Sequence, residues 1–165
     1  MRSGVKATML AEQLEAQDIL LDLTIAPLEP VTPGNGQNIG EKKEKLVNAI
    51  KERISPDNLE RLRHELAGRL VGITVVFLLW KGSPSITNTR PVKDLDNLLK
   101  IVFDVLRHGP QGLGIIEEDS YIGEVYATKQ LVNKEEQEGY RIIIEEHHDP
   151  EMLRTLKQYY SKIPA

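Results

Sequence analysis

The chain has 165 residues, and 21 Lys+Arg against 25 Asp+Glu give it a net charge of -4. It contains no cysteine, which excludes a disulfide framework, a thiol nucleophile and a cysteine-ligated zinc site. Its 40% hydrophobic content is typical of a globular protein, and its length favours a single domain. The most apolar stretch, residues 71–80, is about half as long as a membrane span. With no signal peptide visible, we expect a soluble cytoplasmic protein without a membrane partner.

The first half of the chain is predicted to hold one strand and two helices. Residues 19–25 alternate apolar and polar side chains, which is typical of a half-buried strand. A loop rich in proline and glycine over 27–40 leads to a helix over 41–54, whose apolar residues recur every four positions. Ser55 is then expected to cap a second helix, with Pro56 in its first turn.

The second half is predicted to continue with a strand, a helix, two strands and a last helix. Residues 71–80 are nearly all apolar, which favours a central strand covered on both faces. A loop leads from this strand to an amphipathic helix over 94–107. Residues 121–131 and 140–145 are expected to pair as a hairpin, and the final helix follows Asp149.

These elements follow the order β-α-α-β-α-β-β-α, which predicts an α+β fold with a mixed sheet packed against helices. Helical crossovers connect parallel strands, so the strands on either side of the 94–107 helix are expected to be parallel. We expect a core over residues 18–146. Residues 1–17 form an N-terminal extension, and residues 149–165 form a C-terminal helical appendage.

The segment DLDNLLK, Asp94 to Lys100, is the most informative feature for function. It places two carboxylates two residues apart where a loop becomes a helix, and the positive end of the helix dipole stabilises both as anions. Lys100 lies one turn after Asp96. A second acidic group, Glu117 to Asp119, precedes the next predicted strand. Such carboxylates can bind magnesium, which activates water and neutralises charge on a phosphodiester, and a lysine adds positive charge.

The same residues also have a purely structural interpretation. An aspartate before a helix is an ordinary N-cap, so Asp94 can serve the helix alone. Asp96 and Lys100 can form an ordinary ion pair, since they are four residues apart. The residues by themselves leave both interpretations open.

Residues 91–125, PVKDLDNLLKIVFDVL…GIIEEDSYIGEV, resemble the RusA-type crossover junction endodeoxyribonucleases, the Holliday junction resolvases of phages and bacteria. That family has an Asp-x-Asp-Asn motif at the start of an apolar helix and a lysine four positions after the second aspartate. An acidic pair follows after a Gly-containing turn that leads into a strand. The predicted elements over 19–146 also come in the order of that family, so the resemblance implies a RusA-like fold.

The resemblance implies roles for a small set of residues. Three aspartates would bind magnesium, one lysine would be essential, and one glutamate would have a secondary role at the metal: they are Asp94, Asp96, Asp119, Lys100 and Glu118. The resemblance further implies a homodimer that nicks opposed strands of a four-way DNA junction. The cofactor would be Mg²⁺, with Mn²⁺ as a substitute.

Five basic residues are candidates for DNA contact. They lie before the acidic motif, after the apolar strand and at the start of the first predicted helix: Arg90, Lys93, Lys81, Lys42 and Lys43. Residues 41–107 hold 13 Lys+Arg and 9 Asp+Glu, so the segment with the motif is mildly basic although the whole chain is acidic. The net charge therefore does not exclude a polyanionic substrate, and it predicts salt-sensitive affinity.

Two other classes of function stay open. One is a non-catalytic DNA- or protein-binding module with a RusA-like fold, and the other is a metal-dependent phosphohydrolase for a small phosphorylated substrate. The loop from Gly34 to Lys42 has no phosphate-loop spacing, so we expect no nucleotide cofactor. Glu124 and Lys129 lack the spacing of the Glu-x-Lys motif of another nuclease superfamily, and the sequence assigns them no role.

Overall fold

The computed structural model describes residues 19–33, 38–83, 86–87, 90–91, 93–107, 109, 112–147, 158 and 161–162. The predicted N-terminal extension and nearly all of the predicted C-terminal helix lie outside these residues. Within the described ranges, no helix has both the length and the apolar character needed to span a bilayer.

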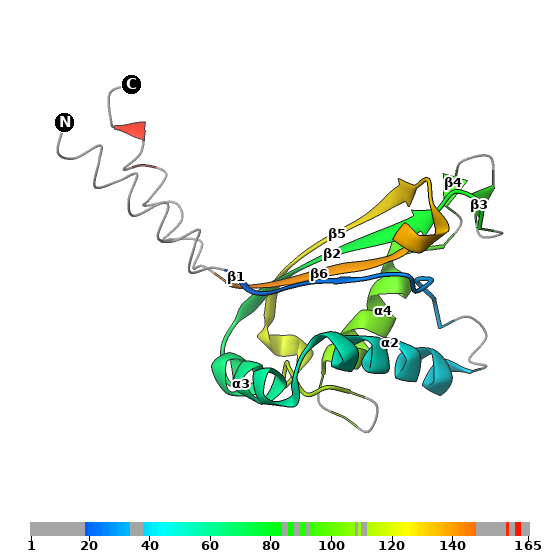
Figure 1. The fold of residues 1–165 in the computed structure, drawn as a ribbon. Helices are drawn as coiled ribbons and strands as arrows, with labels where there is room; N and C mark the ends of the chain where they lie inside the picture. The colour runs from blue at the N-terminus through cyan, green and yellow to red at the C-terminus, as the bar shows by residue number, and fades with distance from the viewer. Residues whose placement is uncertain are drawn as a thin grey trace.

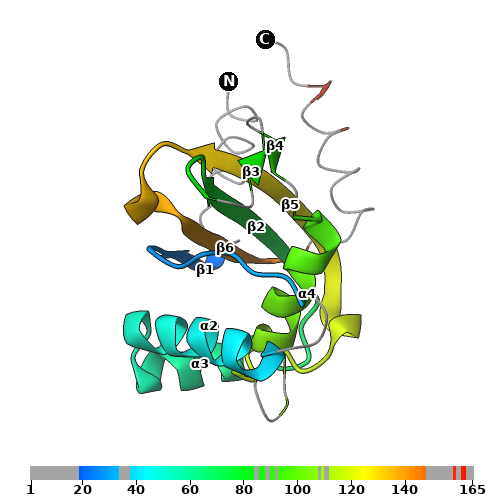
Figure 2. The same cartoon turned by 90° about the vertical axis from the view of Figure 1, so that its right-hand side faces the viewer.

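The core is one open, mixed, four-stranded sheet with helices on one face (Figures 1 and 2). The strands β1 (Ile19–Ile25), β2 (Val71–Trp80), β5 (Ile122–Val132) and β6 (Gly139–Glu146) are arranged in the order β1-β6-β2-β5. β2 and β5 are parallel, as predicted from the helical crossover between them. β6 is antiparallel to both of its neighbours, β1 and β2.

The predicted hairpin between the last two strands is wrong. β6 does not pair with β5 but lies between β1 and β2, and the connection contains the short helix η2 (Glu135–Gln137). Burial favours this arrangement: Tyr140, Ile142 and Ile144 of β6 are all buried on the helix-facing side, as suits a central strand. β5 carries exposed residues such as Tyr126, which is 64% exposed, and this favours the edge of the sheet.

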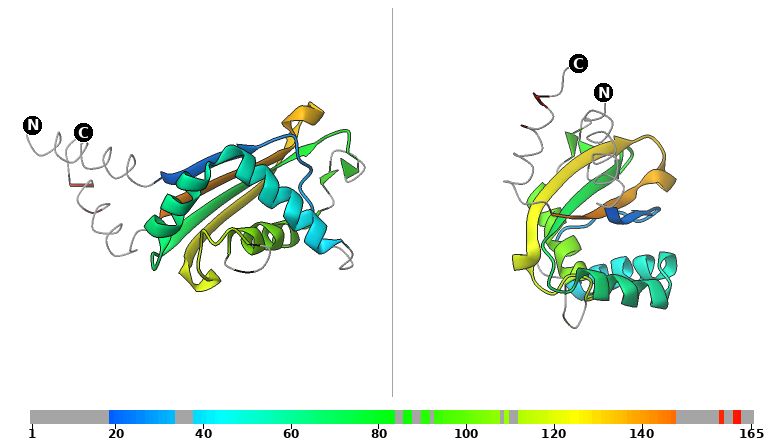
Figure 3. Two further views of the ribbon diagram at one scale, coloured as in Figure 1. Left: turned by 60° about the horizontal axis from the view of Figure 1, so that its bottom comes forward. Right: turned by 90° about the vertical axis from the view of Figure 1, so that its left-hand side faces the viewer.

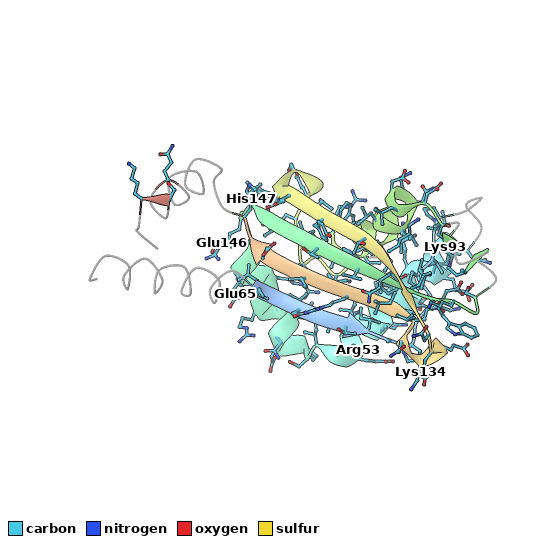
Figure 4. The ribbon with its side chains drawn as sticks, turned by 90° about the horizontal axis from the view of Figure 1, so that it is seen from above. Arg53, Glu65, Lys93, Lys134, Glu146 and His147 are labelled. Atoms are coloured by element: carbon cyan, nitrogen blue, oxygen red, sulfur yellow. The ribbon has the colours of Figure 1, made fainter. Side chains whose placement is uncertain are left out.

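The prediction that residues 71–80 are covered on both faces is also wrong. Ile73, Val75, Phe77 and Leu79 of β2 are buried, whereas the residues between them are only half-buried. The described helices all lie on one side of the sheet, and Figure 4 shows the strands from the opposite side. The apolar side chains on this second side are partly exposed, so composition alone overestimated the burial of the strand.

Within the described ranges, three helices cover the other face: α2 (Ile39–Arg53), α3 (Pro56–Leu66) and α4 (Leu95–Leu106). The predicted cap of α3 is confirmed, because the Ser55 hydroxyl accepts a hydrogen bond of 3.2 Å from the Asn58 N–H. α4 presents an apolar stripe to the core: Leu98, Ile101, Val102, Val105 and Leu106. This packing fixes one side of α4 against the core and leaves polar residues such as Asp96 and Lys100 exposed.

The predicted loop between β2 and α4 contains two short strands, β3 (Ile86–Thr87) and β4 (Arg90–Pro91), which pair antiparallel. They lie beyond the end of β2, where α4 begins (Figure 1). α4 connects two parallel strands and therefore runs back along the sheet. Its first turn lies near the ends of β2 and β5, and its last turn lies near the start of β5.

Candidate functional site

Asp94 and Asp96 both lie at the start of α4, and both are exposed. Asp94 has an extended backbone, and its carbonyl accepts the first hydrogen bond of the helix, 3.0 Å from the Leu98 N–H. Its side chain makes no capping hydrogen bond. Asp94 is thus the N-cap residue by its backbone conformation. Its carboxylate, however, does not make the capping hydrogen bond that the purely structural interpretation predicts.

Lys100 extends into solvent one turn after Asp96. Its ammonium group donates a hydrogen bond of 3.1 Å to the side-chain oxygen of Asn97. Among the described residues, no ion pair joins Lys100 to Asp96, and neither aspartate carboxylate has a hydrogen-bonded partner. The two structural explanations for the acidic pair, a cap and an ion pair, are therefore both absent. The carboxylates remain available for a ligand.

Glu118 and Asp119 lie toward the other end of α4. Asp119 is the first residue of the short helix η1 (Asp119–Tyr121). Three residues earlier, the Ile116 N–H donates a hydrogen bond of 3.0 Å to the carbonyl of Leu106, the last residue of α4. Figure 3 shows this turn, in yellow, beyond the C-terminal end of α4. A helix rises about 1.5 Å per residue, so the ends of a helix of 12 residues lie about 18 Å apart. The Asp119 side chain lies outside the described residues, and the exposed Glu118 accepts a hydrogen bond of 3.1 Å from Ser120.

The start of α4 carries carboxylates, which are the type of ligand that magnesium takes. In the part of the chain that the structure describes, no three His, Cys, Asp or Glu side chains are grouped so that they could hold a metal ion. Mg²⁺ does not require such a cage, because it is usually bound by one or two carboxylates, with waters and substrate phosphate oxygens as the other ligands. Asp94 and Asp96 supply two exposed carboxylates of this kind.

Comparison with models of known protein families found no match, and comparison with curated proteins found none either. The functional interpretation therefore depends on the chemistry of the site and on the resemblance of residues 91–125.

Three of the basic residues predicted to contact DNA are held by partners within the chain. Lys42 donates to the Thr32 carbonyl at 3.0 Å, and Lys43 lies 2.9 Å from a carboxylate oxygen of Asp104. Lys93 donates to Glu29 and to the Pro30 carbonyl. The other two candidates are Lys81, which is exposed, and Arg90, whose side chain lies outside the described residues.

The ion pair between Lys43 and Asp104 gives Lys43 a structural role. Burial raises the pKa of the Asp104 carboxyl group, but hydrogen bonds from Lys43 and Arg107 outweigh this effect, so the pKa lies below its ordinary value. Both side chains of the Lys43–Asp104 pair are largely buried, with 16% and 28% exposure. The pair therefore links α2 to α4 and stabilises the packing of the helix that carries the acidic motif.

Sequence reasoning missed one residue near the acidic motif, Lys129 of β5. Its ammonium group donates a hydrogen bond of 3.0 Å to the carbonyl of Lys93, which immediately precedes Asp94. Lys129 pairs with the fully buried Phe77 in the sheet register, so it occupies a helix-facing position. The signal in the sequence was period-two alternation, which groups Lys129 with the apolar residues Ala127 and Leu131 on one face.

Proposed function

We propose that this protein is a magnesium-dependent, structure-selective DNA endonuclease of the RusA type. It would act as a homodimer in the cytoplasm and resolve four-way junctions by paired phosphodiester hydrolysis, in DNA recombination and repair. One observation carries the proposal: Asp94 and Asp96 are exposed at the start of a helix packed on the core, and neither carboxylate has a hydrogen-bond or ion-pair partner among the described residues. The helix dipole stabilises both anions, and two exposed carboxylates at one helix end are also ligands of the kind that Mg²⁺ accepts.

The proposed roles follow from the chemistry of each group. Asp94 and Asp96 hold Mg²⁺ (or Mn²⁺ as a substitute) through their carboxylate oxygens. When bound, the metal supplies an activated water and neutralises charge on the phosphodiester. Lys100 is exposed on the same helix, and its ammonium group stabilises the negative charge that develops on the phosphate oxygens. The hydrogen bond from Lys100 to Asn97 holds that ammonium group near the first turn of α4.

The resemblance also assigns Asp119 to the metal, with Glu118 in a secondary role. Since η1 begins near the end of α4 opposite Asp94, this part of the proposal needs its own test. Asp119→Asn removes the charge and keeps the shape of the side chain. Loss of magnesium binding in this variant would support Asp119 as a ligand, whereas unchanged binding would restrict the metal ligands to Asp94 and Asp96.

The decisive experiment is cleavage of synthetic four-way junctions with Mg²⁺, with linear duplex as the comparison substrate. We expect the parent protein to nick the junction and Asp96→Asn to be at least about 100-fold slower, because electrostatic and metal contributions of this kind are that large. Asp57→Asn is the matched control, since Asp57 is an exposed aspartate in the first turn of α3. Absence of junction cleavage by the parent over a broad range of conditions would overturn the proposal.

A second candidate is a non-catalytic DNA- or protein-binding module. It is favoured by the internal partners of Lys42, Lys43 and Lys93, which leave fewer free cations for DNA. Titration calorimetry with Mg²⁺ distinguishes the two candidates, because only the endonuclease needs a metal site at Asp94 and Asp96. Hydrolysis of nucleotides without cleavage of DNA would instead indicate the third class, a small-molecule phosphohydrolase.

A further inference from the structure

The turn that carries Asp94 is held by lysine side chains on two sides. On one side, Lys129 of β5 donates a hydrogen bond of 3.0 Å to the Lys93 carbonyl. On the other side, the Lys93 ammonium group lies 2.8 Å from a Glu29 carboxylate oxygen and 2.6 Å from the Pro30 carbonyl oxygen. The residue just before Asp94 is therefore anchored to the sheet through its backbone and to the loop after β1 through its side chain. Figure 4 shows Lys93 at the end of the sheet away from Glu146 and His147.

The position of Lys129 is unusual for a lysine. Across the strands, Lys129 is in register with Phe77, Tyr140 and Ile25. All three are buried on the helix-facing side of the sheet. A partly buried ammonium group loses hydration, and this loss is compensated only if the group finds hydrogen-bond acceptors. The only acceptor among the described residues is the Lys93 carbonyl, and no described carboxylate forms an ion pair with Lys129. The side chain is thus directed at the start of α4.

This contact constrains Asp94 directly. The Lys93 carbonyl and the Asp94 N–H belong to one planar peptide group, so a hydrogen bond that fixes the carbonyl also fixes the direction in which the Asp94 backbone begins. Asp94 has no capping hydrogen bond of its own. The orientation of its carboxylate therefore depends on the backbone position that the Lys129–Lys93 contact maintains.

We propose that Lys129 is a positioning residue of the metal site: through the Lys93 carbonyl, it holds the Asp94 carboxylate in the orientation needed to bind Mg²⁺. This inference rests on the proposed function. Groups that orient metal ligands without touching the metal typically change metal affinity by 10–100-fold when they are removed. We therefore expect Lys129→Met to weaken Mg²⁺ binding by about tenfold.

The experiment compares four full-length proteins: the parent, Lys129→Met, Lys129→Arg and Lys45→Met. Lys45 is an exposed lysine of α2 with no described partner, so its substitution removes the same charge far from the contact. The first readout is Mg²⁺ affinity by titration calorimetry in the absence of DNA. The second is junction cleavage as a function of Mg²⁺ concentration, which separates the half-saturating concentration from the rate at saturation. Circular dichroism confirms that each variant is folded.

The expected result is a roughly tenfold weaker Mg²⁺ affinity and a similar rise in the half-saturating Mg²⁺ concentration for Lys129→Met. The rate at saturating Mg²⁺ should change much less. Lys129→Arg should recover part of the affinity, because its side chain also donates to a carbonyl, and Lys45→Met should match the parent. A merely structural role for Lys129 would lower the melting temperature without changing Mg²⁺ affinity in the folded protein, and that outcome would overturn the inference.

Two further outcomes are distinguishable. If the parent binds Mg²⁺ in a manner that requires Asp94, but Lys129→Met binds it equally well, the inference fails and the proposed function stands. If the parent shows no Mg²⁺ binding that depends on Asp94, the proposed function and the inference both fail. Should Lys129→Met not fold, Lys129→Leu removes the same hydrogen bond to the Lys93 carbonyl with a smaller apolar side chain, and unchanged Mg²⁺ affinity in that variant would contradict the inference.

Discussion

Lys100 donates a hydrogen bond of 3.1 Å to the side-chain oxygen of Asn97, although Asp96 lies one helical turn before it and carries the opposite charge. The ammonium group is therefore held on α4 by a neutral partner. A lysine held in this way keeps its full charge available for an anionic ligand. Little folding free energy depends on this contact. A catalytic role of Lys100 can therefore be tested without a large change in stability.

The first prediction concerns Lys100→Met. Methionine and lysine have similar helix propensity, and Lys100 is exposed, so the free energy of unfolding should change by no more than about 0.5 kcal/mol. In the role proposed for Lys100, its positive charge stabilises the phosphate oxygens, so junction cleavage under single-turnover conditions should fall by about 100-fold. Lys45→Met, measured alongside, should retain the parent rate. A Lys100→Met rate within twofold of the parent would exclude Lys100 from the reaction.

The second prediction concerns the stability of Asp94→Asn and Asp96→Asn. No described group bonds either carboxylate, so each substitution removes only the favourable interaction with the helix dipole, which is worth about 0.3–1 kcal/mol. Ser55→Ala provides the comparison, because the Ser55 hydroxyl makes a true capping hydrogen bond and its loss should cost about 1 kcal/mol or more. Urea unfolding measures all three. If Asp94→Asn cost more than Ser55→Ala, Asp94 would have a structural role.

The local elements of this fold follow from the sequence, while the strand order does not. The alternation in β1 and the apolar spacing of α4 are properties of neighbouring residues, so they predict those elements closely. The pairing of β6 with β1 and β2 depends on which strand buries more apolar surface, which is a property of the whole molecule. A hairpin between consecutive strands is the local solution, and the polar side chains of β5 disfavour it here.

The same distinction applies to the candidate site. Asp94, Asp96 and Lys100 lie within two turns of a single helix, so their spacing and the resemblance of that segment made them candidates from the sequence. Lys129 could not be assigned to the site in this way, because its partner is a backbone carbonyl 36 positions away and carries no residue-specific signal. Likewise, the internal partners of Lys42, Lys43 and Lys93 could not be predicted from a count of basic residues.

The third prediction separates structural lysines from DNA-binding ones. Lys43→Met should lower the free energy of unfolding by about 1 kcal/mol, because it breaks the partly buried pair with Asp104. It should not change the salt dependence of junction affinity. Lys81→Met should change the salt dependence and not the stability. Its free energy of unfolding should be close to that of the parent. Its slope of log affinity against log salt should be smaller by about 0.9 for each phosphate that the variant no longer neutralises.

Junction binding by fluorescence anisotropy between low and moderate salt, without Mg²⁺ so that no cleavage occurs, measures these slopes. A reduced slope for Lys43→Met would show that this residue leaves Asp104 to contact DNA. Equal slopes for Lys81→Met and the parent would remove Lys81 from the DNA-binding surface.

The fourth prediction concerns Tyr140, which joins the core to the loop after β1. Its ring packs edge-to-face against Phe77 with 5.8 Å between ring centroids, and its hydroxyl oxygen accepts a hydrogen bond of 3.2 Å from the Val31 N–H. Burial raises the pKa of the Tyr140 hydroxyl far above its ordinary value of 10.0, and the nearby Glu29 and Glu138 carboxylates contribute in the same direction. The hydroxyl therefore stays neutral in the folded protein when it ionises in the unfolded chain.

The direction of the pH effect follows from this difference. The contribution of Tyr140 to stability is fully present below pH 10.0, the ordinary pKa of tyrosine, and is lost as the pH rises above it, because only the unfolded state releases the proton. By pH 11 the loss should reach about 1.4 kcal/mol for this one group. Tyr140→Phe has no hydroxyl to ionise, so its stability should not include this loss.

Urea unfolding of the parent and Tyr140→Phe from pH 8 to pH 11 tests this prediction. At pH 8 the variant should be less stable by about 1 kcal/mol, because the Val31 N–H loses its acceptor. The difference should shrink above pH 10 and change sign before pH 11, where the variant should be more stable by about 0.4 kcal/mol, since the parent loses about 1.4 kcal/mol that the variant does not. A constant difference across this range would mean that the Tyr140 hydroxyl ionises as readily in the folded protein as in the unfolded chain, and that its burial does not protect it.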